Sequence, residues 1–327
     1  SRFAEIVHPS DLPRVIAAEM DRGTGGAMFL GIDYRIICGD GEVRWVYDYT
    51  VALKDAGGEV SHFAGYLLDI TERKQSEFEL EQAYVEHDYL RNHSLKAGLF
   101  LMPVGIINET HEPPTFYGVE RNPVEKNIIP ATWWEGGLAS TGRFGEGFSY
   151  DVAVTSGLGL EDGEYKIRDG RQKVAKAKAD ALAYTGRLKY TGIAGLELGM
   201  TAQYQEDLYQ DTLADTIDAT LLEAHAAWQV GDFGLRALYA IWDIDDAINT
   251  IKEGADEQTG WYIEPSWRIG ERWGVFARYN DWNNLAGASV DGGITQVDVG
   301  VNYWLNPNVV FKFDYQDQDT EDSDAKE

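Results

Sequence analysis

The chain of 327 residues is long enough for two domains or one large barrel. Its net charge of −27 argues against a general nucleic-acid binder, because phosphate backbones require clustered Lys and Arg. The apolar fraction of 44% excludes a disordered chain, the lack of any apolar run of about 18 residues excludes a transmembrane helix, and the single cysteine, Cys38, excludes an internal disulfide.

The first 75 residues predict a helix followed by three antiparallel strands. Ser10 or Asp11 can cap the helix, Pro13 suits its first turn, and apolar residues then recur on one helical face. Gly- and Asp-rich stretches with hairpin-turn chemistry separate the strands, which we expect at Ala27–Ile37, Glu42–Lys54 and Val60–Leu68.

This region also carries four motifs: His8-Pro9-Ser10-Asp11, Tyr34-Arg35-Ile36, Gly39-Asp40-Gly41-Glu42-Val43-Arg44-Trp45, and Gly65 with Asp69-Ile70-Thr71-Glu72-Arg73-Lys74. Together they resemble the C-terminal half of a PAS sensor domain. The resemblance implies a module that on its own would be cytoplasmic and that passes signals to a following helix. The family's N-terminal half, which closes one side of its ligand cavity, is not matched, so we expect no bound cofactor.

From residue 76 onward, apolar residues alternate with small, polar or charged ones, as Leu198 and Met200 alternate with Gly199 and Thr201. Such alternation predicts strands with one apolar face, and segments of about ten residues suit a tilted crossing of a bilayer. We expect about eleven strands, or twelve if the turn Asn306-Pro307-Asn308 splits the last run: 78–90, 94–102, 133–143, 147–157, 181–191, 194–205, 217–230, 232–243, 260–269, 272–282 and 294–317.

A soluble β-sandwich alternates in the same way. A membrane barrel is favoured by the long strands, by polar faces rich in Glu, Arg and Asn, and by aromatic residues at strand ends, since only a closed barrel satisfies every backbone group in lipid. The predicted fold class is mostly β: an antiparallel transmembrane β-barrel of about 11–12 strands, incomplete, preceded by a partial α+β PAS fold.

The most specific motifs are His93–Gly98, Pro103–Gly105, Asn108–Asn122, Pro130–Gly136 and Asp169–Gln172. They resemble the phosphate-selective porin (O/P type) family, over residues 77–327. The resemblance implies a water-filled outer-membrane channel, usually of sixteen strands and trimeric. Its partners would be small anionic solutes, outer-membrane lipid and, if the barrel is completed, two further copies in a homotrimer.

Fewer strands than sixteen are predicted here, so we expect residues 76–327 to be a barrel region truncated at both ends and joined to a PAS fragment over residues 1–75. The acidic end, Glu321–Glu327, stands where the family has a strand ending in an aromatic residue. The first residues lack the apolar core of a signal peptide. Either that peptide has been removed or this is not the porin's natural start.

A pore needs no catalytic group, so we expect no enzymatic activity; selectivity comes from charges along the lumen. Six basic residues lie in the thirteen-residue stretch 166–178 of an otherwise acidic protein. Folded into the lumen, this stretch would favour anions and contact phosphate; the alternative is a solvated loop or short surface helix. The candidate pore and anion-binding residues are Lys166, Arg168, Arg171, Lys173, Lys176, Lys178, Arg187, Lys189 and Arg236. Arg268, Arg278 and Lys312 could extend the basic track, whereas the acidic lumen candidates Glu197, Glu264 and Asp298 favour weak or mixed selectivity.

Two other functions stay open: a cytoplasmic PAS-containing sensor whose β-rich region binds a partner, and a secreted β-rich binding protein. Dependence on detergent separates the barrel from both. His111 and Glu112 are too few ligands for a metal, so we expect no metal site.

Overall fold

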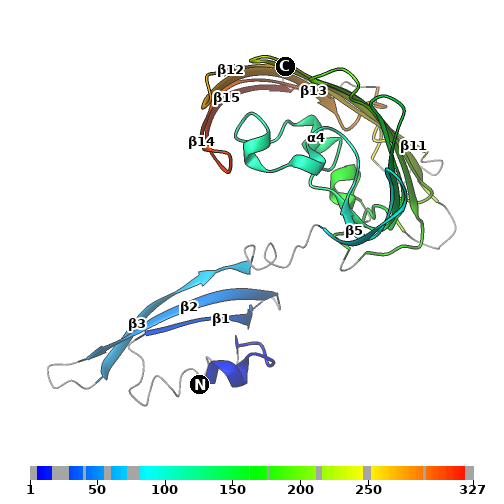
Figure 1. Ribbon diagram of the computed structural model, residues 1–327. Helices are drawn as coiled ribbons and strands as arrows, with labels where there is room; N and C mark the ends of the chain where they lie inside the picture. The colour runs from blue at the N-terminus through cyan, green and yellow to red at the C-terminus, as the bar shows by residue number, and fades with distance from the viewer. Residues whose placement is uncertain are drawn as a thin grey trace, which may run out of the picture. The chain divides into compact units, whose positions relative to one another are not determined.

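The computed structural model describes residues 6–16, 29–39, 42–54, 60–71, 82–161, 163–174, 177–210, 216–245, 252–289 and 292–320 (Figure 1). It divides into two compact units, Ser1–Leu80 and Glu81–Glu327. The predicted boundary after residue 75 falls in the stretch 72–81, which lies outside the described residues, and stays a prediction.

The smaller unit contains the three predicted strands, β1 (Phe29–Ile37), β2 (Val43–Lys54) and β3 (Val60–Asp69), paired antiparallel in that order. A helical turn over residues 12–16 packs against this sheet through a small core of Val7, Val15, Tyr34 and Val46. The predicted helix cap, Asp11, instead accepts three hydrogen bonds of 2.9 Å from Arg35. Burial of that carboxylate beside β1 makes the guanidinium its best partner.

The larger unit is a single antiparallel sheet of twelve strands in which each strand pairs with its neighbours in sequence. The predicted turn at Asn306-Pro307-Asn308 divides the predicted strand 294–317 into two strands. The predicted mostly-β fold class is confirmed. Within the part of the chain that the structure describes, β4 and β15 are the two edges, so the sheet is not closed. The strands are β4 (Ala83–Leu90), β5 (His93–Leu101), β6 (Trp134–Phe144), β7 (Phe148–Thr155), β8 (Ala183–Tyr190), β9 (Leu196–Gln205), β10 (Asp218–Val230), β11 (Phe233–Asp245), β12 (Glu257–Ile269), β13 (Trp273–Asn283), β14 (Ile294–Asn306) and β15 (Val309–Thr320).

The two faces of this curved sheet differ in chemistry. Large apolar side chains are exposed on the convex face, where Met200 is 67% and Phe313 is 73% exposed. Their neighbours in sequence, such as Thr201 and Lys312, lie on the concave face. Because successive side chains of a strand alternate between faces, the apolar-polar alternation of the sequence produces an apolar outside and a polar inside.

The connections also alternate in length. Those at one end of the sheet are short turns, 91–92, 145–147, 191–195, 231–232, 270–272 and 307–308. Those at the other end are long: 102–133, 156–182, 206–217, 246–256 and 284–293. Outer-membrane barrels place short turns in the periplasm and long loops outside the cell.

The longest connection, residues 102–133, lies inside the curve of the sheet (Figure 1) and is called the inner loop below. It contains the short helices η1 (Asn108–Thr110), η2 (Pro113–Thr115) and α4 (Val124–Asn127). The main apolar core joins this loop to the concave face of the sheet and includes Met102, Ile128, Trp133, Leu158, Trp242 and Tyr262. Among the described residues, no helix is long and apolar enough to cross a membrane.

Candidate functional site

The inner loop is held together by the buried carboxylate of Glu125. The amides of Ile106 and Ile107 donate to it at 2.7 and 2.8 Å, and the Asn122 side-chain amide donates at 2.9 Å. The hydroxyl of Tyr262 on β12 donates at 3.0 Å. Since Glu125 is fully buried, these four donors supply the hydrogen bonds that water would give to an exposed carboxylate.

The middle of the inner loop, residues 114–119, reaches across to the last strands of the sheet. Side chains on β11 and β14 bind its carbonyl oxygens: Arg236 donates to Thr115 at 3.0 Å, and Trp304 donates to Pro114 at 3.1 Å. Asp314 on β15 accepts from the Val119 amide at 2.7 Å. The loop is therefore fixed across the concave side rather than extended into solvent. Burial raises the pKa of the Tyr117 hydroxyl in this segment.

Basic residues of the concave wall are paired with carboxylates. Arg187, 6% exposed, bonds to Glu109 of the inner loop and to Asp151 at 2.7 Å. Lys189 lies 3.3 Å from Glu197.

Further along the wall, Glu264 lies 3.9 Å from Arg236 and 2.9 Å from Arg278, which also contacts Asp298 at 2.9 Å. The predicted basic track is thus interleaved with the predicted acidic lumen residues, which lowers its net field.

Two further basic residues of the wall face aromatic rings of the interior. Arg268 lies 3.9 Å from the Trp304 ring centroid, and Lys312 lies 3.6 Å from that of Phe116. Both are cation–π distances.

The predicted basic loop, residues 166–178, packs onto the inner loop instead of lining the wall. Its short helix η3 (Ile167–Gly170) buries Ile167 completely. Arg168 donates to the carbonyl of Lys126 at 2.7 Å, and Arg171 donates to that of Thr132 at 3.1 Å.

The lysines of this loop are placed differently. Lys166 lies 5.9 Å from the Tyr165 ring centroid, the backbone amide of Lys178 is held by Gln172 at 2.8 Å, and Lys173 is exposed. Lys176 lies outside the described residues. A pore role for this loop stays a prediction.

Of the predicted residues, Arg187, Lys189 and Arg236 are brought together on the concave wall. A cavity of about 540 Å³ is lined by Glu109, Lys189, Glu197 and Arg236. A second, of about 390 Å³, shares Lys189 and adds Arg187. Lys189 lines both cavities, and the inner loop borders the first of them through Glu109; the two cavities are called the charged passage below.

The lining residues that sequence reasoning missed include Glu109, Arg143 and Ser149. Arg143 and Ser149 occupy inward positions of alternating strands, so the two-residue period was the signal that could have found them. Glu109 lies on an irregular loop that has no such period.

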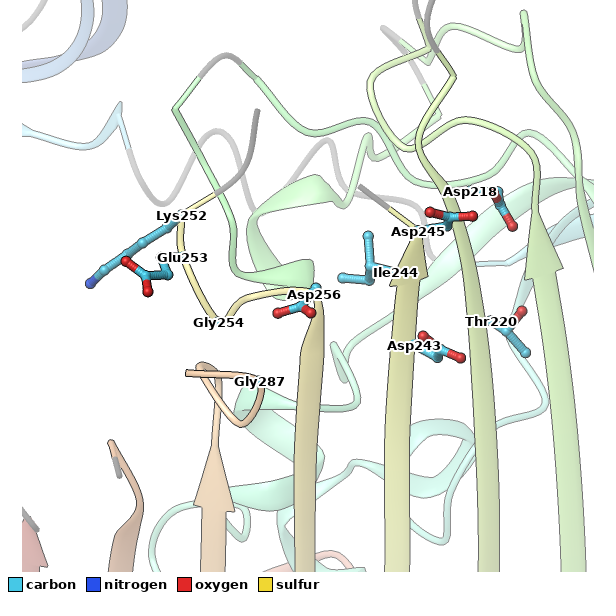
Figure 2. Close-up of a pocket in the computed structure, with 10 residues that line it drawn as sticks. All are labelled: Asp218, Thr220, Asp243, Ile244, Asp245, Lys252, Glu253, Gly254, Asp256 and Gly287. Atoms are coloured by element: carbon cyan, nitrogen blue, oxygen red, sulfur yellow. The ribbon is translucent and has the colours of Figure 1, made fainter. Parts of the chain in front are cut away.

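A larger cavity of about 860 Å³ lies at the long-loop end of the sheet (Figure 2). Figure 2 shows Asp218 on β10, Asp243 and Asp245 on β11, and Glu253 and Asp256 on the connection that leads into β12; Lys252 is the one basic residue shown. In the described ranges, these carboxylates and the other His, Cys, Asp and Glu side chains form no group of three or more that could hold a metal ion. Asp218 and Asp243 occupy the same outward strand positions as the exposed Leu222 and Tyr239, so this acidic cavity lies on the convex side of the sheet and not on the side of the inner loop.

Known proteins resemble both units. The PAS fold family matches residues 1–67, and the Gram-negative porin family matches residues 135–323, more than half of the chain. An uncharacterized protein of Aquifex aeolicus is 29% identical over 282 residues, covering 76% of this chain and 63% of that protein. The chain thus spans less than two thirds of this relative's length.

Of two further similarities, the first is confined to a stretch of 75 residues and the second is a likeness of fold alone. The methyl sulfide methyltransferase-associated sensor of Methanosarcina acetivorans is 36% identical over 75 residues, covering 23% of this chain and 8% of the sensor. The anion-selective porin from Comamonas acidovorans has the same fold with a TM-score of 0.56 at 13% identity, covering 90% of this chain and 89% of that one. The resemblances to PAS and porin families are confirmed, while the O/P type is not. With the porin match extending over most of the strands that carry the concave wall, the chain belongs to the Gram-negative porin family.

Proposed function

We propose that the chain forms an outer-membrane channel through which small anions, phosphate among them, diffuse passively. The observation that carries this proposal is the charged passage along the concave wall, whose two cavities are lined by Arg236 and Lys189 and by Lys189 and Arg187. A passage lined by fixed charges replaces part of an ion's hydration energy and so lowers its barrier to crossing.

The convex face supports insertion in a bilayer. It exposes Leu198, Met200, Leu222, Val299 and Phe313, which is costly in water but favourable in lipid. Aromatic side chains near strand ends, such as Trp267 and Trp273, suit the membrane interface.

Selectivity should be weak. Carboxylates lie beside the basic residues of the passage: Asp151 beside Arg187, Glu197 beside Lys189 and Glu264 beside Arg236. We assign the anion preference to Arg187, Lys189 and Arg236, with Lys166, Arg168, Arg171, Lys173, Lys176 and Lys178 contributing a positive field from the adjoining loop. We expect no catalytic activity from this arrangement.

The proposal also divides the chain into two units with different roles. Residues 1–75 would be the C-terminal half of a PAS domain, and residues 76–327 a barrel region that closes, and forms a homotrimer, only with further strands. The match of residues 1–67 to the PAS fold favours a signalling role as a second candidate function for that unit alone.

Solute flux through liposomes tests the channel. The full chain is refolded in detergent and reconstituted into vesicles loaded with inorganic phosphate and potassium. We expect both ions to leave faster than from protein-free vesicles, with phosphate leaving faster than a neutral sugar of similar size. Vesicles that stay tight, with a chain that remains soluble without detergent, would overturn the proposal.

A further inference from the structure

We infer that Arg143, Ser149 and Lys189 form a binding site for a small oxyanion at the short-turn end of the concave wall. This inference rests on the proposed anion channel and names a site within it. A bound oxyanion of the phosphate class would pause there before leaving through the end of the sheet that carries the short turns.

The sheet register places the three residues in one row. Arg143 on β6 lies directly opposite Ser149 on β7, and Ser149 lies directly opposite Lys189 on β8. Neighbouring strands are about 4.8 Å apart, so the two basic residues lie about 10 Å apart at their backbones with the hydroxyl between them. Side chains as long as Arg and Lys can both reach an ion above Ser149.

All three residues line the same cavity of about 390 Å³. Thr141 and Ser94 add hydroxyl groups to its wall. Because Lys189 also lines the neighbouring cavity of about 540 Å³, an ion in the site remains in contact with the rest of the passage.

The donors of this site are available. Arg143 is exposed, and within the described ranges no carboxylate pairs with it and no group bonds the Ser149 hydroxyl. The ammonium of Lys189 has one contact, at 3.3 Å, with Glu197, which is long for a charged hydrogen bond. An arginine fork, a hydroxyl and a second cation are the donor set that binds an oxyanion by several bonds at once.

Two carboxylates also line the cavity, and each has a basic neighbour. Asp151 accepts from Arg187 at 2.7 and 2.9 Å, and Glu86 lies directly opposite Lys96 in the register of β4 and β5. The lining residues thus carry three basic groups, on Arg143, Arg187 and Lys189, against the two carboxylates of Glu86 and Asp151, and this excess of one positive charge favours an anion over a cation.

Inhibition of chloride current by inorganic phosphate tests the site. The full chain is recorded in planar bilayers with constant chloride while phosphate is added on the short-turn side. We expect saturable inhibition, and the half-inhibiting concentration should rise about tenfold in Arg143→Gln and about threefold in Ser149→Ala. Arg91→Gln removes the same charge from an exposed position on the β4–β5 turn outside the cavity, and it should leave the concentration unchanged.

The outcomes separate this site from the channel itself. A conducting channel that phosphate does not inhibit, or that Arg143→Gln and Arg91→Gln affect equally, would overturn the site and leave the channel intact. If no current is seen, the proposed function fails. Calorimetric titration of phosphate into the detergent-solubilised chain then decides the site: binding lost in Arg143→Gln supports it, and no binding overturns it.

Discussion

Replacing Glu125 by Ala should release the inner loop from the wall. The carboxylate accepts four hydrogen bonds, from the amides of Ile106 and Ile107, the Asn122 side chain and the Tyr262 hydroxyl. Each donor left without a partner in a buried site costs about 1 kcal/mol or more, so the four together cost about 4 kcal/mol. At about 1.4 kcal/mol for each factor of ten, the population of the opened loop should rise about a thousandfold.

Amide hydrogen exchange measures that population. In the detergent-solubilised chain, peptides covering Ile106 and Ile107 should exchange about a thousand times faster in Glu125→Ala, up to the limit set by global unfolding. Glu120→Gln is the matched control: it changes a carboxylate of the same loop that is exposed and 3.6 Å from Lys126. Equal protection of these amides in Glu125→Ala and the unmodified chain would refute the role of the buried carboxylate.

Three other changes test separate parts of the structure. Arg278→Met removes the ion-pair partner of the buried Asp298 and the nearer of the two basic neighbours of the buried Glu264, and it should destabilise the sheet by about 3–5 kcal/mol, seen as a lower urea midpoint; an unchanged midpoint argues against this pairing. In Gly199→Ala the new methyl would lie 2.1 Å from Cε1 of His225, so the chain should unfold at a lower temperature, measured as the temperature at which its mobility on a gel changes. Gly186→Ala is the control, because open space surrounds its new methyl, and it should leave that temperature unchanged. Hydrogen bonds from Arg35 lower the pKa of Asp11 to about 2. Their stabilisation is complete above the ordinary value of about 4 and is lost as the pH falls to about 2, so exchange of β1 amides should accelerate in that window in the unmodified chain and not in Asp11→Asn.

The strands were predictable because a two-residue apolar period leaves a direct trace in the sequence. The predicted 217–230 and 272–282 became Asp218–Val230 and Trp273–Asn283. The same period would have placed Arg143 on the inward face. Once the turns are recognised, the pairing register of such strands is also fixed, because a shift by one residue would move every apolar side chain to the other face.

The charge pairs were not predictable in the same way. Arg187 and Glu109 are 78 residues apart and meet only because the inner loop folds back onto the wall. The basic loop posed the same difficulty, since Arg168 and Arg171 bind carbonyl oxygens of the inner loop that no side-chain pattern announces. Backbone acceptors are present at every residue, so local sequence does not reveal which of them a guanidinium will reach.

The reversal potential in planar bilayers tests most directly whether the charged passage conducts ions. With the full chain inserted and potassium chloride in a tenfold gradient, we predict discrete current steps and a small reversal potential of the sign for chloride preference. Absence of steps would contradict ion conduction by this passage, and a reversal potential near the full value for potassium would contradict its preference for anions.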